Sequence, residues 1–372
     1  MATKQRAKIL LLIPHLGGGG AEQITATLAR YLSRQRYELH LGLVTESTHT
    51  TEAIPSWDTV HTLGVRRVRY SAWRLLRLVW LVRPAVILSG MAHLNLLVLL
   101  LRPLFPSRTC VFVRQNGPLS ATLEVGGKPR LSRRLYGAGY RRADKVICQT
   151  QPMADELQRE LGVDSAKLAV LPNPVNVQAI RTWAAMTDGI PPSGPRLIAI
   201  ARLSPEKGID LLLEAFAGVL RTFPCAELEI AGSGQCESAL KAQCTVLGIE
   251  NRVHFLGDVA EPASLLHCSS LFVLSSRYEG MPNALLEAAA AGLPLVAFPA
   301  SPGLVEQIRG RNGIWIANEI SAHALKDALC GALSSIQSGQ RFEHSWIEPF
   351  DLKNAIPAYE NLIDEALQER ET

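Results

Sequence analysis

The chain has 372 residues, of which 47% are hydrophobic and 19% are charged, a composition typical of a folded protein and not of a disordered one. Its length allows two domains. The longest apolar stretch, residues 94–101, is far shorter than the ~20 residues that span a bilayer, and the apolar run that ends at Pro14 is too short for a secretory leader. We therefore expect a cytoplasmic protein without membrane-spanning helices.

The net charge of +4 conceals an uneven distribution. Residues 1–172 carry an excess of 13 positive charges, whereas the remainder carries an excess of 9 negative charges. This imbalance suggests that the first half faces an anionic surface or ligand. The seven cysteines are scattered and form no CxxC pair, which predicts reduced cysteines, mostly in the core, and no metal site; they are Cys110, Cys148, Cys225, Cys236, Cys244, Cys268 and Cys330.

Short apolar strands alternate with helices along the chain. The first series has a glycine loop and helix at 17–35, and predicted strands at 8–14, 37–45, 85–89, 109–114, 145–150 and 168–173. The pattern then restarts with a helix at 207–220 and strands at 196–202, 226–232, 252–257, 270–276 and 294–299. Such alternation predicts parallel sheets with crossover helices, and its repetition predicts two doubly wound α/β domains.

We place the N-terminal domain at 1–172 and the second domain at 173–349, joined by the proline-containing segment 171–177. A terminal amphipathic helix, within about 350–372, is expected to pack back on the first domain. Ligands of doubly wound sheets bind at the carboxyl ends of the strands. With two such domains, the cleft between them is the predicted binding site.

The first candidate motif is HLGGGGAEQ, residues 15–23, between the first strand and the first helix. Its glycines allow the backbone to approach a phosphate, and a helix N-terminus adds positive potential. The motif does not match G-x-G-x-x-G, and Glu46 lies just past the second strand, so a nicotinamide-binding interpretation stays open beside that of a plain tight turn.

The second motif is ARLSPEKGID, residues 201–210. Arg202 ends the first strand of the second series, and Lys207 stands five residues on, at the start of a predicted helix. Two cations at the carboxyl end of a strand suit a diphosphate. The alternative is a pair of surface cations, but a cation at a helix N-terminus opposes the helix dipole, which favours a ligand there.

The third motif is EGMPNALLEAAAAGLPLV, residues 279–296, in which Glu279 precedes a turn and Glu287 lies in a predicted helix. The residues Asn283, Ala284 and Leu285 would present unpaired N–H groups to an anion. The two carboxylates would lie roughly 12 Å apart if all eight residues were helical. That distance is wide for a hydrolase pair and suits an elongated anionic ligand held at both ends. An ordinary amphipathic helix after a turn is the alternative.

Two weaker candidates are AGSGQ, residues 231–235, and HFLGDV, residues 254–259. The first is a glycine turn after a strand, and in the second the backbone at Leu256–Val259 could contact a base. A plain turn at the end of a strand explains either one taken alone.

In this order and spacing, the glycine loop, R-L-S-P-E-K-G, G-S-G, F-L-G and E-G-x-P-N-x-x-x-E resemble a family 4 retaining glycosyltransferase of the GT-B fold over nearly the whole chain. The resemblance implies that Arg202 and Lys207 hold the donor diphosphate, Glu287 binds the ribose and Glu279 contacts hydroxyls of the transferred sugar. It further implies that donor-binding positions lie at Gly18, Gly19, Gly257, Val259, Gly280, Met281, Pro282, Asn283, Leu285 and Leu286.

One departure from the family pattern concerns a histidine that contacts the donor sugar in many relatives. It lies near the end of the strand that here reads TCVFVRQNG, where this chain has Arg114, Gln115 and Asn116. Gln115 or Asn116 could hydrogen-bond a sugar without acting as a base. His15 and His93 lie at other strand ends and are interpreted as structural or acceptor-facing residues, so no catalytic histidine is carried over.

The resemblance implies transfer of a sugar from a nucleotide-diphosphate sugar with retention, and UDP is the commonest nucleotide of the family. The sequence contains no Asp-x-Asp, so we expect Arg202 and Lys207 to replace a divalent metal ion and no cofactor to be needed. A nucleotide-sugar epimerase and a non-catalytic nucleotide-sugar-binding protein are the alternatives. The former would need an acid/base pair around the sugar, which Glu279 alone does not supply.

The acceptor is predicted from the basic first half. Residues 66–83 are rich in arginine, with Trp73, Leu76 and Trp80 at helical spacing, and residues 128–142 add six cations. Basic amphipathic helices with tryptophan are typical of membrane surfaces, which predicts a peripheral protein on the inner face of the plasma membrane that acts on a lipid-linked or glycan acceptor of a surface glycan such as lipopolysaccharide. The alternative is an ordinary helix with its apolar face on the sheet. No motif supports nucleic-acid binding.

Overall fold

The structure is a computed structural model that describes residues 6–16, 19–45, 57–124, 129–186, 194–259 and 263–370. The chain divides into two compact units. Unit 1 comprises Met1–Pro174 with Leu352–Thr372, and unit 2 comprises Val175–Asp351. The division falls inside the segment 171–177 in which the joint was predicted.

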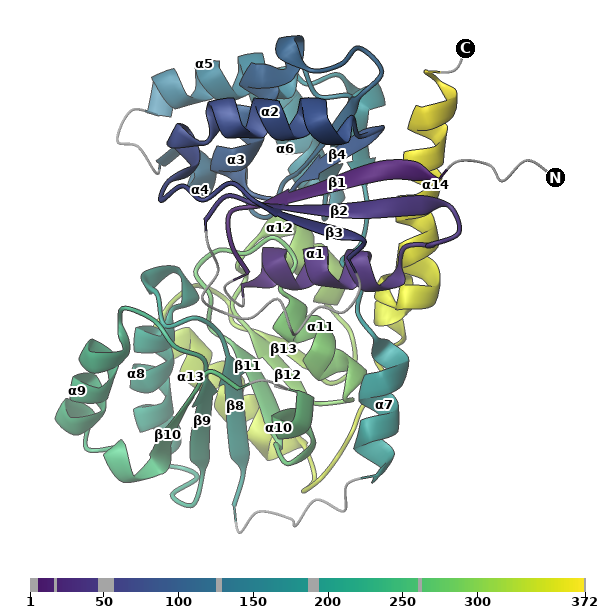
Figure 1. The fold of residues 1–372 in the computed structure, drawn as a ribbon. Coiled ribbons are helices and arrows are strands. Elements are labelled where there is room, and N and C mark those ends of the chain that lie inside the picture. The colour runs from purple at the N-terminus through teal and green to yellow at the C-terminus, as the bar shows by residue number, and fades with distance from the viewer. Residues whose placement is uncertain are drawn as a thin grey trace. The chain divides into compact units, whose positions relative to one another are not determined.

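Unit 1 is built on a seven-stranded parallel sheet with the order β3-β2-β1-β4-β5-β6-β7. The strands β1, β2, β3 and β4 are labelled in Figure 1. The strands are β1 (Ala7–Ile13), β2 (Tyr37–Leu43), β3 (Thr59–Thr62), β4 (Val86–Ser89), β5 (Cys110–Arg114), β6 (Lys145–Cys148) and β7 (Leu168–Val170). The helices are α1 (Gly20–Tyr31), α2 (Ala72–Val82), α3 (Ala92–Leu101), α4 (Leu119–Glu124), α5 (Pro129–Tyr140), α6 (Gln151–Leu161) and α14 (Leu352–Gln368).

The central strands of unit 1, such as β1 and β4, are almost continuous apolar runs because helices cover both faces of the sheet. In β1, Leu10 and Leu12 pack in the core beneath α2, α3 and α6, whereas Ile9, Leu11 and Ile13 pack in the core beneath α1 and α14. All five side chains are buried. Successive residues therefore supply opposite faces, as the twofold period of a strand requires.

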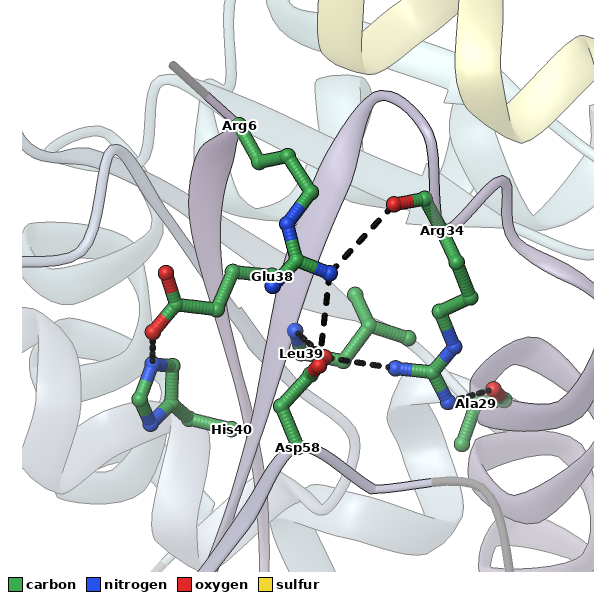
Figure 2. Close-up of polar contacts among 7 residues, drawn as sticks. All are labelled: Arg6, Ala29, Arg34, Glu38, Leu39, His40 and Asp58. Atoms are coloured by element: carbon green, nitrogen blue, oxygen red, sulfur yellow. Dashed lines mark hydrogen bonds and ion pairs between the residues drawn. The ribbon is translucent and has the colours of Figure 1, made fainter.

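The edge strand β3 was not predicted, because Thr59–Thr62 is short and mostly exposed. It is held beside β2 by a side chain. The Asp58 carboxylate accepts the Leu39 N–H at 2.7 Å and lies 2.8 Å from Arg34 and 3.3 Å from Arg6 (Figure 2). Burial opposes ionisation of this carboxyl, but the Leu39 N–H and the two guanidinium groups outweigh it and lower the pKa of Asp58.

The last helix, α14, packs on unit 1. Its buried face joins the core that contains β1 and β2, and the Tyr37 hydroxyl donates to Asp364 at 2.6 Å. Glu360 accepts the Ser33 N–H at 2.8 Å and pairs with Arg36 at 2.9 Å. The chain therefore returns to its first unit at its end.

Unit 2 is built on a six-stranded parallel sheet with the order β10-β9-β8-β11-β12-β13. The strands are β8 (Arg196–Ile200), β9 (Glu227–Ala231), β10 (Val253–Gly257), β11 (Leu271–Leu274), β12 (Leu295–Ala297) and β13 (Ile314–Ile316), of which the last was not predicted. The helices are α7 (Val177–Met186), α8 (Ile209–Val219), α9 (Glu237–Leu247), α10 (Ala263–His267), α11 (Asn283–Ala290), α12 (Pro302–Ile308) and α13 (Ala322–Ser335).

Both sheets reverse their strand order once, as Rossmann-like sheets do. The first strand of each unit lies between its second and fourth strands, so the reversal falls between β1 and β4 in unit 1 and between β8 and β11 in unit 2. Ligands of such sheets bind outside the carboxyl ends of the strands at this point. Within the ranges that the structure describes, no helix is both long and apolar enough to cross a bilayer.

Candidate functional site

The candidate site of unit 2 lies where its strand order reverses. β8 ends at Ile200 and β11 ends at Leu274, and these two strands are neighbours in the sheet. Arg202 and Lys207 follow β8, and Glu279 follows β11. The three predicted catalytic residues therefore lie beyond the same edge of one sheet.

Lys207 and Glu279, 72 positions apart in the sequence, form an ion pair. The Lys207 ammonium lies 2.5 Å from the Glu279 carboxylate, and the Ser276 hydroxyl donates to the same oxygen at 2.8 Å. The side chains of Lys207 and Glu279 are only 19% and 13% exposed. Lys207 was expected at the start of a helix, but it closes the short 3-10 turn Pro205–Lys207 ahead of α8. Lys207 therefore does not lie in the first turn of α8, and the Glu279 carboxylate balances its charge. For both reasons the helix dipole gives no argument for a ligand at Lys207.

The turn that carries Lys207 is packed tightly on the loop that carries Glu279. Gly208 has a φ of +62°, and a Cβ there would lie 2.1 Å from the Ser275 carbonyl oxygen, so only glycine fits. The Ser275 hydroxyl donates to the Lys207 carbonyl at 2.9 Å. The backbone therefore fixes the distance between the two charged residues.

Arg277 makes a second set of contacts between the turn that carries Lys207 and the loop that carries Glu279. The Arg277 guanidinium donates to both Asp210 oxygens, at 2.8 and 2.6 Å, and the Arg277 N–H donates to the Glu206 carbonyl at 2.8 Å. The hydrogen bonds from Arg277 lower the pKa of Asp210 despite its partial burial. Sequence reasoning missed Arg277 and Asp210, since they are 67 positions apart and neither has a local signature.

Arg202 is the exposed cation of the site. Its side chain is 66% exposed and lies 3.5 Å from Glu206. Burial raises the pKa of Glu206, but the Ser204 hydroxyl and the cations Arg202 and Lys207 outweigh this and lower it. The site thus offers one exposed guanidinium beside one paired ammonium, an arrangement able to bind a diphosphate.

The helix after Glu279 differs in detail from its prediction. α11 begins at Asn283 with Pro282 as its N-cap, so residues 279–282 are not helical and the 12 Å estimate for Glu279 and Glu287 does not hold. The N–H groups of Leu285 and Leu286 donate to the Pro282 carbonyl at 3.2 and 3.3 Å. The prediction that the Leu285 N–H is unpaired was wrong, because the first turn of the helix closes on the proline.

The segment Gly280–Asn283 was predicted to line the sugar pocket. The Gly280 carbonyl accepts the Ser301 hydroxyl at 3.4 Å. The Met281 side chain is buried in the apolar core together with Leu285 and Leu286. Glu287 and Asn283 lie half-buried on α11. The backbone contacts with a donor stay predictions.

The two weak motifs of the sequence come together in the structure. The Gly232 N–H donates to the Gly257 carbonyl at 2.7 Å, and the Ser233 hydroxyl donates to Asp258 at 2.7–2.8 Å. The Leu203 N–H in turn donates to the Ser233 carbonyl at 2.8 Å, which joins both turns to the segment of Arg202. Val259 follows them, half-buried. Each turn alone was weak evidence for a binding site. In the structure, hydrogen bonds connect both turns with the segment that carries Arg202.

In unit 1, the candidate residues lie where β1 and β4 end. Gly18 and Glu46 lie outside the described residues, while Gly19 is the N-cap of α1. His15 lies 3.6 Å from the buried carboxylate of Glu22, and a Cβ on Gly19 would lie 2.5 Å from that carboxylate. A carboxylate therefore stands beside the loop that was predicted to approach a diphosphate. Glu22 was missed, although a glutamate three residues after an N-cap is a known helix-start signal.

The remaining candidates are one histidine, His93, and two amides, Gln115 and Asn116. His93 follows β4, and burial together with the neighbouring His15 lowers its pKa. Gln115 is buried, accepts the Tyr140 hydroxyl at 2.8 Å and donates to the Gly117 carbonyl at 2.8 Å, so its amide is satisfied within the fold. Asn116 is half-buried, and its amide is also bonded within the fold, because it accepts from Arg114 and donates to the Gly90 carbonyl.

Two family models match the chain in succession. Residues 18–179 match the model described as Glycosyltransferase Family 4, and residues 187–345 match Glycosyl transferases group 1. Solved glycosyltransferases share the fold: Anabaena HepE in complex with UDP and glucose has a TM-score of 0.81 at 18% identity and covers 96% of this chain and 100% of that one. WaaG, a glycosyltransferase involved in lipopolysaccharide biosynthesis, has a TM-score of 0.70 at 16% identity and covers 96% and 98%.

Curated relatives agree over parts of their length. A D-inositol 3-phosphate glycosyltransferase of Segniliparus rotundus is 30% identical over 260 residues, which cover 66% of this chain and 56% of that protein. An uncharacterized glycosyltransferase of Haemophilus influenzae is 32% identical over 123 residues, 33% of this chain and 35% of that protein. The first three curated relatives are matched over only 35%, 43% and 27% of their own lengths.

The two Rossmann-like units have the GT-B fold of these solved structures. The two family models, which together match most of the chain, make the assignment more specific. The chain belongs to the family 4 glycosyltransferases.

Proposed function

We propose that this protein is a retaining glycosyltransferase that transfers a sugar from a UDP-sugar to a lipid-linked or glycan acceptor in the synthesis of a surface glycan. The observation that carries the proposal is the Lys207–Glu279 ion pair beside the exposed Arg202, at the point where the strand order of unit 2 reverses. Two cations there can hold a diphosphate, and a carboxylate can accept hydrogen bonds from sugar hydroxyls.

The assignment of a UDP-sugar draws on relatives. HepE has been solved with UDP and glucose, and this chain has the same fold. The contacts of Gly208 and Arg277 hold the turn of Lys207 in a fixed position against the loop of Glu279, as electrostatic stabilisation of a leaving diphosphate requires. An epimerase would need an acid/base pair at the sugar, and Glu279 is already committed to Lys207.

The same charges support a metal-independent mechanism, whereas retention is proposed from the family resemblance alone. Arg202 and Lys207 supply the positive charge that a divalent ion would bring to the leaving group, and the acceptor hydroxyl attacks from the side of the departing phosphate. We expect transfer to survive EDTA, and a strict requirement for a divalent ion would contradict this mechanism. The anomeric configuration of the product, read by NMR, tests retention.

The acceptor proposal is supported by the outer face of α2. The inward face of this helix, Leu75, Leu78, Val79 and Val82, packs on the sheet, as the ordinary-helix interpretation expects. That interpretation does not explain Trp73 and Leu81, each 74% exposed, or Trp80, which is 50% exposed. Leu76, predicted on the same stripe as the tryptophans, is instead partly buried against the core.

We define the exposed stripe of α2 as Trp73, Arg77, Trp80 and Leu81, which share one side of the helix at the i, i+4, i+7, i+8 spacing. The Trp80 indole N–H donates to the Leu104 carbonyl at 3.0 Å, and Leu104 extends the apolar surface. Tryptophan and leucine beside arginine suit the headgroup region of an anionic membrane. We therefore propose that this stripe places the enzyme beside a lipid-linked acceptor.

Vesicle sedimentation tests the membrane proposal. The protein should bind vesicles that contain phosphatidylserine, and the double variant Trp73→Ser/Leu81→Ser should bind at least about tenfold more weakly, since each exposed apolar side chain contributes about 1 kcal/mol on burial. Val246→Ser is the matched control, because Val246 is an exposed apolar residue of unit 2. Equal binding by both variants would overturn the proposal.

Incubation with labelled nucleotide sugars separates the candidate functions. A glycosyltransferase moves the label to an acceptor, an epimerase converts the donor, and a non-catalytic binding protein returns it unchanged. A prior screen for thermal stabilisation identifies the donor, since a ligand at ~100 times its dissociation constant adds ~2.7 kcal/mol to the stability of the folded state.

A further inference from the structure

Arg114, the last residue of β5, is a buried guanidinium without a carboxylate partner. The residue is 3% exposed. One terminal nitrogen donates to the Asn116 side-chain oxygen and the other to that of Asn173, both neutral amides. Its Nε has no hydrogen-bond partner, and within the described parts of the chain no carboxylate forms an ion pair with it.

Such a charge is costly unless something compensates it. A buried ion loses its hydration, and two amide oxygens return only part of that energy, so buried charges in proteins are normally paired. Cys148, the titratable group beside Arg114, does not supply a negative charge. Burial raises the pKa of its thiol to about 12, although Arg114 acts in the opposite direction. The fold therefore retains a positive charge that none of the described residues neutralises.

Two further unsatisfied donors lie at the same edge of the sheet. Ser89 ends β4, pairs with Val113 in the sheet and has a fully buried hydroxyl without a partner. Thr150 lies two residues beyond β6, the neighbour of β5 on the other side, and its buried hydroxyl is also unpartnered. This hydroxyl does not cap α6, which begins at the next residue. Unsatisfied donors therefore lie at or just beyond the ends of β4, β5 and β6, although the strand period places Ser89, beside Val113, on the face of the sheet opposite to Arg114.

We infer that Arg114 binds an oxyanion of a substrate, a phosphate or a carboxylate, at the carboxyl edge of the unit 1 sheet. Guanidinium groups bind both anions through two parallel hydrogen bonds. Asn116 is half-buried, and its side chain accepts a hydrogen bond from Arg114 and donates one to the Gly90 carbonyl. In our proposal an oxygen of the bound oxyanion replaces the Asn116 side-chain oxygen as the acceptor for Arg114. The inference rests on the proposed glycosyl transfer only in naming the anion as part of a substrate.

Thermal unfolding of the full chain tests the site without any assay of transfer. Inorganic phosphate and glucuronate, each added in place of chloride at constant ionic strength, represent the two sources of an oxyanion. We expect at least one of them to raise the Tm of the wild type, and Arg114→Gln to raise the corresponding dissociation constant at least about tenfold. Arg114→Lys keeps the charge and should retain part of the effect.

The controls separate a binding role from a structural one. Arg102→Gln removes an arginine of the same unit that pairs with Asp144 at 3.3 Å, so it should lower the Tm and leave the anion effect unchanged. A purely structural Arg114 would give the same result as Arg102, a lower Tm with an intact anion effect, and would overturn the inference. No stabilisation of the wild type by either anion would overturn it as well.

A second arm keeps this inference apart from the proposed function. Saturating UDP should leave the effect of phosphate or glucuronate in place, because the donor diphosphate is assigned to Arg202 and Lys207 in unit 2. If UDP abolishes the anion effect, Arg114 belongs to the diphosphate site and the inference of a separate oxyanion is wrong. Stabilisation by phosphate alone identifies a phosphate-bearing substrate, and stabilisation by glucuronate alone identifies an acidic sugar. Both results stand even if no nucleotide sugar is turned over.

Discussion

The Lys207–Glu279 ion pair supports a quantitative prediction about stability and donor binding together. We consider Lys207→Met, Glu279→Gln and the double variant, which form a double-mutant cycle. Exposed ion pairs contribute about 0.2–1 kcal/mol, whereas breaking a buried pair costs about 3–5 kcal/mol. Because the two side chains are 19% and 13% exposed, we expect a coupling energy between these limits, about 2 kcal/mol.

The matched control is the Lys241–Glu237 pair of α9. Its charged atoms lie 2.7 Å apart, but its side chains are 55% and 35% exposed. The corresponding cycle, Lys241→Met with Glu237→Gln, should give a coupling energy of no more than about 0.5 kcal/mol. Urea unfolding followed by fluorescence measures both cycles within the same unit, where the difference in burial is the main variable.

Donor binding then distinguishes the roles of the two partners. In Glu279→Gln the Lys207 ammonium no longer shares its charge with a carboxylate, so UDP should bind at least as tightly as it does to the wild type. A UDP-sugar should lose its advantage over UDP, because the hydroxyl contact of Glu279 is gone. Lys207→Met should weaken both ligands by about tenfold or more, as expected for a lost charged hydrogen bond. Isothermal titration calorimetry measures both affinities.

Two outcomes would refute this reasoning. A coupling energy equal to that of the Lys241–Glu237 control would mean that burial does not strengthen the pair. Equal weakening of UDP and UDP-sugar in Glu279→Gln would mean that Glu279 supports the turn around Lys207 and does not contact the sugar.

Three further predictions concern the supports of the site and of the fold. Gly208→Ala should lower stability by about 1–3 kcal/mol in urea unfolding, because φ is +62° there, while Gly331→Ala, in a helix with open space around it, should be neutral or stabilising. Arg277→Leu should weaken UDP binding about tenfold in calorimetry, because the turn of Lys207 loses its anchor; unchanged affinity would contradict this role of Arg277. Asp58 has a lowered folded pKa, so its contribution is complete above the unfolded value and is lost as the pH falls through the folded one; Asp58→Asn should cost about 1 kcal/mol at neutral pH and progressively less as the pH falls, and a cost that persists undiminished in acid would contradict the assignment.

The general architecture could be predicted from the sequence because its signals are local. Continuous apolar runs such as residues 8–14 become strands buried on both faces, and their alternation with helices dictates parallel sheets. Thr59–Thr62 and Ile314–Ile316 carried no such signal. These edge strands are short, and β3 depends on the Asp58 carboxylate from outside the strand.

The positions of the charged residues after strands could also be predicted one at a time, while their roles stay predictions. Arg202, Lys207 and Glu279 stand directly after strands, where a parallel sheet places its binding residues, and this follows from the order of elements alone. The order of strands and helices gave no reason to single out Glu22 or Arg277. Glu22 lies beside the glycine loop, and Arg277 holds the turn of Lys207 by binding Asp210.

By itself, then, the sequence determined two doubly wound units and the strand ends at which charged residues gather. Only the tertiary structure decided the partners of those residues: it paired Lys207 with Glu279, left Arg202 exposed and left Arg114 buried without a carboxylate. The physical reason is that strand and helix periodicity depends on neighbours within a few residues. An ion pair or an uncompensated charge depends on segments that the fold brings together from dozens of positions apart.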